Sequence, residues 1–425
     1  MKVEVYPSAI SGEVQAPGSK SIAQRAVACA LLANGESTLL HFPDSDDCEA
    51  AIRAAQALGA VITRSGDTVV IRGGFPHNST AGIRNPKPNI QCVESGLASR
   101  MFTPLAALYD EGITINGEKS LLTRPFDEFV KVLPQLGAQV SSLNGRLPVK
   151  VKGPLTGGKA EMDGSLSSQF ITGVILACTQ AEKTTVLKVK DAKSTPYLDL
   201  TMEMAKYFGA EIKHKAYQEF TIKGNQPFQP RQFAIEGDWS GASFLFVAAA
   251  IAADEGVLIK GLSLDFSQAD SAILEVIKAV GATVRKQKNG YWVQRNSIEA
   301  FEFDATDCPD LFPPLVALAA YANGVCTITG AERLVHKESN RAKVLTDEFA
   351  KANIRIVTRG DEMKIYPGHI RPCTMSAHGD HRIAMAAAIL ALNGDKITIT
   401  GAECVSKSYA HFFDHLASLG VKMRR

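Results

Sequence analysis

The chain lacks the features that mark membrane proteins, secreted proteins and strongly basic nucleic-acid-binding proteins. Its 46 lysines and arginines nearly balance its 44 aspartates and glutamates, so the formal net charge of the 425 residues is only +2. So small a charge provides no general field for nucleic acid or a membrane surface, and any anion site must be local. No apolar run reaches the roughly 20 residues of a membrane span. Met1–Val5 is typical of a first strand and not of a signal peptide.

The cysteines form no CxxC pair and show no metal-ligand spacing. They are scattered along the chain at positions 29, 48, 92, 178, 308, 326, 373 and 404. This scatter predicts buried thiols, a cytoplasmic location and no metal site. A Gly-x-Gly-x-x-Gly motif after a strand is also missing, which argues against a Rossmann fold.

What the chain does contain is a repeat. A short Gly-Ala type of break follows an amphipathic run at six places, whose central residues are Gly59, Gly137, Gly209, Gly281, Asn353 and Gly420. The intervals between them are 78, 72, 72, 72 and 67 residues. Such regular self-similarity indicates a repeated structural unit.

Each repeat has the same predicted order: an alanine-rich helix, a turn, a short strand, a second helix that ends at the Gly or Asn, and a β-hairpin. The alanine-rich helices are expected at 21–33, 96–109, 168–180, 241–253, 310–322 and 381–392. This alternation predicts α/β layers with these helices buried. Strand 3–5 has no repeat of its own and must pair with another repeat's sheet. Six repeats divide into two groups of three, although an open solenoid is compatible with the repeat alone.

The residues at the starts of the alanine-rich helices are polar or glycine. They lie at 19–21, 95–96, 165–169, 238–240, 307–310 and 379–382. Helix capping explains the serines and aspartates, but it does not explain the bases Lys20, Arg25, Arg100 and Arg382. Because helix N-termini carry partial positive charge, several starts on one side of a domain would form a pocket for anions. The pattern predicts a small substrate with phosphate and carboxylate groups.

Three further stretches carry bases outside the helix starts. Arg124 precedes a proline, which favours an extended conformation. Residues 337–341 carry two bases and Glu338, and residues 406–409 occupy the place in the sixth repeat that 194–197 occupy in the third. Taken singly, such stretches are more typical of solvated loops and charged helix starts.

Together these stretches resemble the enolpyruvyl transferases, and among them the EPSP synthase family. The matching residues are Pro-Gly-Ser-Lys-Ser at 17–21 with Arg25, Gly96 with Arg100, Arg124-Pro125, Asp163–Gln169, Lys337-Glu338 with Arg341, Asp380-His381-Arg382, and Lys407-Ser408. Any one of these is a weak signal, whereas their order and spacing over nearly the whole chain are highly specific.

The resemblance implies an inside-out α/β fold of two domains, each with three α/β repeats around pseudo-threefold symmetry. It places the first strand with the last three repeats, so the implied domains are 1–17 plus 236–425, and 18–235, with the active site in the interdomain cleft. It implies no cofactor and no metal. The expected partners are the small-molecule substrates alone, without nucleic acid or membrane, and the chain is expected to be a monomer.

The implied reaction transfers the enolpyruvyl group of phosphoenolpyruvate to the 5-hydroxyl of shikimate-3-phosphate and releases phosphate through a tetrahedral intermediate. This is a step of the shikimate pathway to chorismate and the aromatic amino acids. By position, the residues that would bind shikimate-3-phosphate are Lys20, Ser21, Arg25, Ser167, Ser168, Gln169, Ser194, Asp310 and Lys337. Those that would bind phosphoenolpyruvate are Lys20, Gly96, Arg124, Gln169, Arg341, Arg382 and Lys407.

The resemblance also implies catalytic roles. Asp310 matches the general base near the 5-hydroxyl, and Glu338 matches the proton donor to the methylene carbon. Lys20 is a second acid or base, and His381 is expected to support Glu338. Opposite roles require different environments, so the pKa of Glu338 should be the higher of the two carboxyl pKa values.

The chain departs from the family pattern at four positions. Glu94, Leu97 and Met101 replace the residues usual around Gly96, and Arg333 replaces a usual Asn. A carboxylate at position 94 beside an anion site should point away or pair with a base. Leu97 and Met101 leave sensitivity to the inhibitor glyphosate open.

Three alternatives remain. The sister enzyme that uses UDP-N-acetylglucosamine commonly has a reactive Cys in the loop that matches 118–125, where this chain has none, and prefers Asn at the position of Ser21. A non-catalytic relative is disfavoured by the presence of Lys20, Asp310, Glu338 and Lys407. A repeat protein like the RNA-phosphate cyclases is disfavoured by the six repeats and the balanced charge.

Overall fold

The chain folds into two compact domains in the computed structural model, which describes residues 1–74, 87–335 and 337–425. The discontinuous domain is Met1–Ser19 with Glu236–Arg425, and the inserted domain is Lys20–Ile235. The crossing expected after residue 17 lies two residues later. Gly18 forms an isolated β-bridge with Gly237, and the Ser19 amide donates to the Glu236 carbonyl at 2.7 Å. These contacts connect Gly18 and Ser19 to the discontinuous domain.

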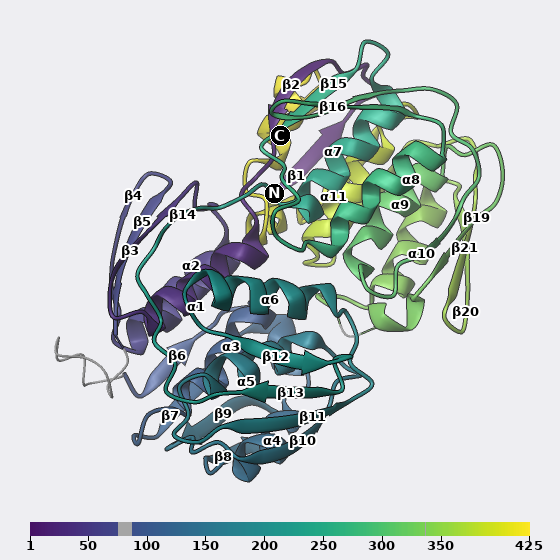
Figure 1. Ribbon diagram of the computed structural model, residues 1–425. Coiled ribbons are helices and arrows are strands. Elements are labelled where there is room, and N and C mark those ends of the chain that lie inside the picture. Colours follow the sequence, from purple (N-terminus) through teal and green to yellow (C-terminus); the bar gives the residue numbers. More distant parts are fainter. Residues whose placement is uncertain (75–86, 336) are drawn as a thin grey trace. The chain divides into compact units, whose positions relative to one another are not determined.

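The inserted domain contains six described α-helices and a 3-10 turn (Figure 1). They are α1 (Lys20–Leu32), α2 (Asp46–Ala57), α3 (Gly96–Ala106), η1 (Lys119–Thr123), α4 (Asp127–Gln135), α5 (Ser168–Cys178) and α6 (Pro196–Tyr207). Its described strands are β3 (Gly35–Leu40), β4 (Val61–Ser65), β5 (Thr68–Gly73), β6 (Asn89–Gln91), β7 (Ile113–Asn116), β8 (Gln139–Leu143), β9 (Arg146–Lys152), β10 (Lys159–Asp163), β11 (Thr185–Lys190), β12 (Ile212–Lys215), β13 (Glu219–Ile222) and β14 (Gln232–Ala234).

The discontinuous domain has a matching set of elements within its described residues. Its helices and turns are α7 (Trp239–Ala252), η2 (Ala269–Ala272), α8 (Ile273–Ala279), η3 (Pro309–Leu311), α9 (Phe312–Ala319), η4 (Ala331–Leu334), α10 (Arg341–Lys351), α11 (His381–Leu390), η5 (Ala402–Lys407) and α12 (Phe412–Ser418). Its strands are β1 (Lys2–Val5), β2 (Gly12–Gln15), β15 (Val257–Lys260), β16 (Thr283–Gln287), β17 (Gly290–Gln294), β18 (Glu302–Asp304), β19 (Cys326–Thr329), β20 (Arg355–Arg359), β21 (Glu362–Tyr366), β22 (Cys373–Ser376), β23 (Ile397–Thr400) and β24 (Met423–Arg424).

The strands of the described residues form three four-stranded sheets in each domain. In the inserted domain the orders are β14-β3-β5-β4, β6-β7-β9-β8 and β10-β11-β13-β12. In the discontinuous domain they are β2-β15-β17-β16, β18-β19-β21-β20 and β22-β23-β1-β24. Each sheet begins with a parallel pair and continues with antiparallel strands. The predicted three repeats per domain are therefore confirmed.

Two strands are exchanged between repeats where the chain passes from one domain to the other. β2 precedes α1 in the chain but pairs with β15, and β14 precedes α7 but pairs with β3. β1 pairs with β23 and β24 and so supplies a strand that the sixth repeat lacks. The prediction that the first strand completes the sheet of another repeat is confirmed.

The alanine-rich helices form the interior of each domain, as the inside-out arrangement requires. Every residue of α3, α7, α9 and α11 is buried, and in α1 and α5 only Lys20, Ser21 and Gln169 are half-buried. Within the discontinuous domain α7, α9 and α11 contact one another, and within the inserted domain α3 contacts both α1 and α5. A helix that is apolar all round is stable only when covered on every side, and the sheets provide that cover.

The second helix of each repeat ends as predicted. One residue beyond the C-cap of each helix lies the Gly or Asn at the centre of the repeated break. The φ angles of these six residues are all positive, between +69° and +102°. Such left-handed backbone favours Gly, and Asn among the other residues. These six residues therefore occupy the C′ position, directly after the C-cap of each helix.

Two details differ from the predictions. The helix expected at 310–322 begins as the 3-10 turn η3, because Pro313 and Pro314 supply no amide donors for a regular first turn. The α-helix α9 follows and ends at Ala319. The thiols of Cys373 and Cys404 are only half-buried, since they lie in an edge strand and a surface turn, whereas the other six cysteines are buried. No described helix combines the length and apolarity needed to cross a membrane.

Gly173 is the point at which α5 lies against α3, and it provides a test of the packing. A Cβ atom there would lie 2.4 Å from the Arg100 carbonyl oxygen and 3.1 Å from the Met101 Cα. These backbone atoms cannot move independently of α3, so we expect Gly173→Ala to lower the free energy of unfolding by about 1–3 kcal/mol. Gly112→Ala is the control, because its Cβ would meet only the flexible end of Lys150. If urea unfolding shows equal losses of unfolding free energy for Gly173→Ala and Gly112→Ala, the close approach of α5 to α3 is contradicted.

Candidate active site

The discontinuous domain gathers acidic side chains around one fully buried guanidinium, that of Arg341 at the start of α10. Nη1 of Arg341 lies 2.7 Å from Asp310 Oδ1, and Nε lies 2.7 Å from Asp380 Oδ2. Nη2 donates to Glu338 and, at 3.2 Å, to Asp380 Oδ1. The carboxylates come from η3, from the loop before α10 and from the N-cap of α11, so the guanidinium joins three segments of the domain.

Asp310 is shared with two more cations. Its Oδ2 lies 2.9 Å from Arg382 Nη2, and its Oδ1 lies 3.3 Å from Lys337 Nζ. Burial alone would raise the pKa of this carboxyl, but Arg382, Lys337 and Arg341 outweigh burial and hold the pKa well below its usual range. Asp310 is therefore ionised at neutral pH and balances part of the surrounding positive charge.

His381 and Lys407 lie at the same helix start. Arg382 Nη1 is 2.9 Å from His381 Nε2. A guanidinium can only donate, so Nε2 accepts, and the proton of the neutral ring lies on Nδ1. Lys407 Nζ donates to the Gly379 carbonyl at 2.9 Å, directly before the N-cap of α11. The expected support of Glu338 by His381 stays a prediction.

The inserted domain brings together the starts of α3 and α5. Arg100 Nη1 donates to Gln169 Oε1 at 2.8 Å, and its guanidinium lies 4.6 Å from the centre of the Phe170 ring. A Cβ atom on Gly96 would lie 2.7 Å from Arg124 Nη1 and 3.4 Å from Gln169 Oε1. Only a glycine lets the Arg124 guanidinium approach the α3 backbone so closely. The two arginines and the helix N-terminus form a positive corner suited to an anion.

Lys20 and the serines of α5 occupy the other helix starts of this domain. Lys20 is the first residue of α1, and its Nζ lies 2.8 Å from Asp47 Oδ2 on α2. Ser167 caps α5, with its hydroxyl accepting from the Gln169 amide at 3.3 Å. Ser168 is the first residue of the helix and is buried.

Arg25 lies one turn beyond the start of α1 and is almost fully buried. Its Nε donates to Thr201 Oγ1 at 2.9 Å, Nη1 to the Ser21 carbonyl at 2.9 Å and Nη2 to the Tyr197 carbonyl at 3.2 Å. The Tyr197 amide in turn donates to the Ser194 carbonyl at 3.1 Å, so Ser194 lies at the same corner. Burial lowers the pKa of Arg25 to about 10. Among the described residues, these hydrogen bonds of Arg25 go to neutral oxygens.

Sequence reasoning missed the acidic partners of the predicted bases. The sequence predicts Asp380 as a helix cap and as part of a family motif, yet Asp380 also holds Arg341. Asp47 is not among the predicted site residues, yet it pairs with Lys20. The signal for these acids is the number of bases in helices that are predicted to be buried, because a buried charge favours a nearby counter-charge.

Two of the departures from the family pattern have local explanations. Glu94 pairs with Lys119 at 3.4 Å and accepts from the Ser120 hydroxyl at 3.0 Å. The expectation that it either points away or pairs with a base is met by the second possibility. Arg333 Nη1 donates to the Thr306 carbonyl at 2.8 Å, which fixes the turn η4 to the segment that follows β18.

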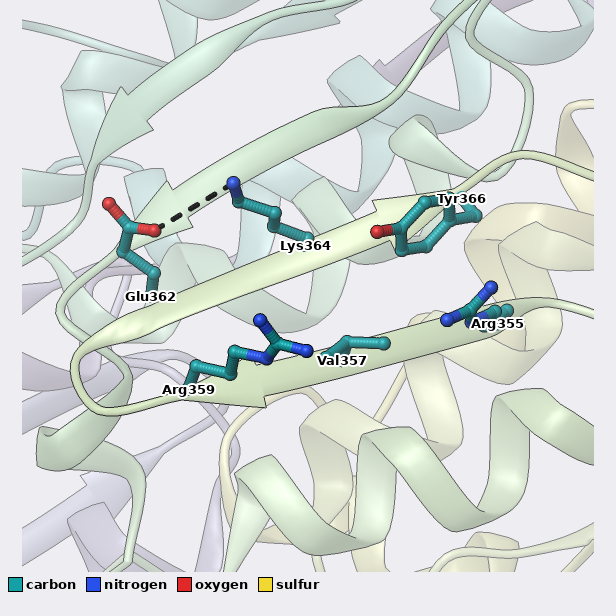
Figure 2. Close-up of a pocket in the computed structure, with 6 residues that line it drawn as sticks. All are labelled: Arg355, Val357, Arg359, Glu362, Lys364 and Tyr366. Carbon is teal, nitrogen blue, oxygen red and sulfur yellow. Dashed lines mark ion pairs between the residues drawn. The ribbon is translucent and has the colours of Figure 1, made fainter.

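The surface hollow shown in Figure 2 is separate from these clusters. It lies on the outer face of the hairpin β20–β21 and is lined by Arg355, Val357, Arg359, Glu362, Lys364 and Tyr366. Two of its cations already have partners: Lys364 lies 4.0 Å from Glu362, and Arg355 stacks 4.7 Å from the Tyr366 ring centre. No predicted site residue lines this hollow, and we interpret it as a solvated face of the hairpin.

The paired charge of Asp310 predicts a pH-dependent contribution to stability. A carboxyl whose pKa is lowered by folding stabilises the protein above its unfolded pKa of about 3.9, and loses that contribution as pH falls through the lower folded value. Asp310→Asn should therefore reduce the free energy of unfolding by about 3 kcal/mol at pH 7, with a smaller difference below about pH 4. Urea unfolding of Asp254→Asn is the control, because Asp254 forms an exposed pair with Arg295. A difference that stays constant down to pH 2 would contradict the assignment.

Comparison of the sequence with known proteins shows the family to which this chain belongs. The sequence profile of EPSP synthase (3-phosphoshikimate 1-carboxyvinyltransferase) matches residues 5–416. The 3-phosphoshikimate 1-carboxyvinyltransferase of Clostridium kluyveri is 34% identical over 98% of this chain and 97% of its own. That of Methanosarcina acetivorans is 35% identical over 100% and 99% of the two chains.

Solved structures share the fold. EPSP synthase from Acinetobacter baumannii has a TM-score of 0.83 at 24% identity, with both chains covered in full. The enolpyruvyl transferase NikO from Streptomyces tendae has a TM-score of 0.77 at 19% identity, covering 100% of this chain and 98% of its own. The resemblance drawn from the sequence motifs is confirmed, and the chain belongs to the EPSP synthase (3-phosphoshikimate 1-carboxyvinyltransferase) family.

Proposed function

We propose that this chain transfers the enolpyruvyl group of phosphoenolpyruvate to the 5-hydroxyl of shikimate-3-phosphate, a step of aromatic amino acid biosynthesis. The observation that carries the proposal is the match to the family over residues 5–416, together with curated relatives of that name along the whole chain. Those names also favour shikimate-3-phosphate over UDP-N-acetylglucosamine as the acceptor. The cation clusters of both domains suit two substrates that each carry a phosphate and a carboxylate.

Phosphoenolpyruvate is assigned to the cations that lie at helix starts. Arg124 lies against Gly96 in the inserted domain, and Arg341, Arg382 and Lys407 lie at the starts of α10 and α11 or beside them. Planar guanidinium groups bind phosphate and carboxylate through paired hydrogen bonds. Lys20 and Gln169 complete the proposed set and reach both substrates.

Shikimate-3-phosphate is assigned to the serines and Arg25 of the inserted domain. Ser167, Ser168 and Gln169 present hydroxyl, amide and backbone N–H groups at the start of α5, which suits a phosphate. Arg25 and Ser194 share a corner whose contacts to Arg25 are neutral oxygens, which suits the ring carboxylate. Ser21 and Lys337 are proposed to bind the same substrate, and Asp310 to meet its 5-hydroxyl.

Asp310 becomes a stronger base when the substrate arrives. Without substrate, Arg382, Lys337 and Arg341 hold its pKa well below the usual range, and such a carboxylate is a poor proton acceptor. Arg341 and Arg382 are the same cations that phosphoenolpyruvate would bind. An anion that draws them away from Asp310 therefore raises its pKa and prepares it to take the proton of the 5-hydroxyl.

The remaining steps follow from the same residues. As the hydroxyl oxygen attacks C2 of phosphoenolpyruvate, Glu338 gives a proton to the methylene carbon and a tetrahedral intermediate forms. Loss of a proton from the resulting methyl group then restores the double bond as phosphate departs. The arginines and Lys20 stabilise the charge on the leaving phosphate. All of these groups lie in one chain, so the proposed chemistry needs no second copy, and a monomer is expected.

Phosphate release tests the proposed function. We expect release from phosphoenolpyruvate only when shikimate-3-phosphate is present, and we expect Asp310→Ala to lower kcat at least about hundredfold through loss of the general base. Asp254→Ala, which removes an exposed carboxylate of the same domain, should retain the wild-type rate. Release with UDP-N-acetylglucosamine and none with shikimate-3-phosphate would overturn the proposal.

A further inference from the structure

A buried carboxylate outside the proposed site, that of Glu348 on α10, contacts the turn that leads into α11. Its Oε2 accepts from the amide of Ser376, the last residue of β22, at 2.9 Å. Its Oε1 lies 2.7 Å from Nε2 of His378. Lys351, three residues further along α10, donates to Oε2 at 2.6 Å. One carboxylate therefore connects the end of a strand, and the turn that follows it, to a single helix.

Glu348 is ionised at neutral pH. Burial alone would raise its pKa, but the hydrogen bonds from Lys351, His378 and the Ser376 amide together outweigh burial and lower the pKa below its ordinary value. An ionised carboxylate can only accept hydrogen bonds, so Nε2 of His378 is the donor to Oε1. Three donors therefore converge on one charged acceptor.

The turn between β22 and α11 has a backbone that needs support from its surroundings. The Asp380 amide donates to the Ala377 carbonyl at 2.8 Å, and the two residues between them, His378 and Gly379, have φ angles of +50° and +68°. Positive φ is uncommon for a residue other than Gly, and such a conformation persists where the surrounding structure holds it. The hydrogen bond from the His378 ring to Glu348 provides such a hold.

The same turn contacts two of the cations assigned to phosphoenolpyruvate. Asp380 Oδ2 lies 2.7 Å from Arg341 Nε, and Asp380 Oδ1 lies 3.2 Å from Arg341 Nη2. The Gly379 carbonyl accepts from Lys407 Nζ at 2.9 Å. A shift of this turn would therefore displace partners of Arg341 and Lys407 at once.

We propose that Glu348 is a positioning residue. Through the turn that it holds, it keeps Asp380 and the Gly379 carbonyl where they orient Arg341 and Lys407 for phosphoenolpyruvate. The role rests on the proposed function, in which both cations bind that substrate. Because Glu348 acts through this turn, its loss should weaken binding of phosphoenolpyruvate more than binding of shikimate-3-phosphate.

The inserted domain has a similar arrangement around Glu128, a buried residue of α4. Its Oε2 accepts from the amide of Asp163, the last residue of β10, at 3.1 Å, and it pairs with Lys131 on the same helix. The N-cap of α5, Ser167, follows four residues after this strand end, which is the spacing between β22 and the N-cap of α11. In both turns the side chain at the strand end accepts from the amide two residues later.

The two glutamates do not occupy matching places in their repeats. Glu128 lies nine residues before Gly137, and Glu348 lies five residues before Asn353, the residues at the centre of the repeated break. A simple copy of one repeat would place them alike. The similar contact, made from different turns of the helix, therefore favours a requirement at the strand end itself, where a helix with proposed substrate-binding residues follows.

The test measures both Michaelis constants of Glu348→Gln in the full chain by phosphate release. The amide keeps the shape of the side chain, but it replaces one acceptor oxygen by a donor and removes the charge. We expect KM for phosphoenolpyruvate to rise about tenfold, with KM for shikimate-3-phosphate within about twofold of wild type. His378→Asn keeps a residue that tolerates positive φ but has a shorter side chain, and should raise KM for phosphoenolpyruvate about threefold.

Asp347→Asn is the matched control, because Asp347 is the exposed neighbour of Glu348 on α10 and pairs with Lys343 on the same helix. It should leave both KM values unchanged. Glu128→Gln removes the corresponding contact before α5 and should raise KM for shikimate-3-phosphate more than KM for phosphoenolpyruvate.

Three outcomes would overturn the proposal. The first is an unchanged KM for phosphoenolpyruvate in folded Glu348→Gln, and the second is an equal rise of both KM values in that variant. The third is a selective rise of KM for phosphoenolpyruvate in Asp347→Asn or Glu128→Gln, which would show that the effect is not specific to this turn. If Glu348→Gln does not fold, an unchanged KM for phosphoenolpyruvate in His378→Asn refutes the role.

Equilibrium titration with phosphoenolpyruvate separates this proposal from the proposed function, because binding is measured without turnover. A wild-type chain that binds phosphoenolpyruvate but releases no phosphate with shikimate-3-phosphate would refute the proposed function alone. If the wild type releases phosphate and Glu348→Gln binds phosphoenolpyruvate as tightly as the wild type, the positioning role alone is refuted.

Discussion

The buried guanidinium of Arg341 is the constraint on which the discontinuous domain's charged cluster depends. It is fully buried, so its charge must be balanced within the protein. Asp380 balances it from the N-cap of α11, Asp310 from η3, and Glu338 from the loop before α10. Two of these carboxylates are also the proposed base and acid. The ion pairs that balance the buried charge of Arg341 therefore also place the proposed reacting groups beside the cations.

The inserted domain also contains buried or half-buried cations, but fewer carboxylates among its described residues balance their charge. Lys20 is balanced by Asp47, but the hydrogen bonds of Arg25 go to neutral oxygens among the described residues. Arg124 lies against Gly96, where a helix N-terminus adds further positive character. The central guanidinium of the discontinuous domain is thus paired with carboxylates, whereas in the inserted domain Lys20 pairs with Asp47 and the hydrogen bonds of Arg25 go to neutral oxygens among the described residues. Both arrangements favour small ligands with several negative charges.

The sequence predicted the repeats, the buried helices and the helix ends, because these features depend on local patterns. A Gly or Asn at the end of an amphipathic run is favoured by the left-handed backbone of a helix end. This cause is local, so it can be recognised within a single segment of sequence. The exchange of β2 and β14 could not be predicted, because each strand pairs with a partner far away in the sequence: Gly12 of β2 lies opposite Val257 of β15, and Gln232 of β14 lies opposite Thr38 of β3. The bases of the site were found from motifs, whereas Asp47 and the second role of Asp380 emerged only when tertiary packing placed them beside Lys20 and Arg341.

Asp380 provides the most direct test of the central claim, that a buried guanidinium held by carboxylates organises the site. It is fully buried, caps α11 and contacts Arg341 through both oxygens. The decisive measurement is kcat/KM for phosphoenolpyruvate, at saturating shikimate-3-phosphate, in folded Asp380→Asn. We expect a loss of about hundredfold or more, because the amide keeps the shape of the side chain but removes the charge that orients Arg341. Activity within about twofold of wild type would contradict it.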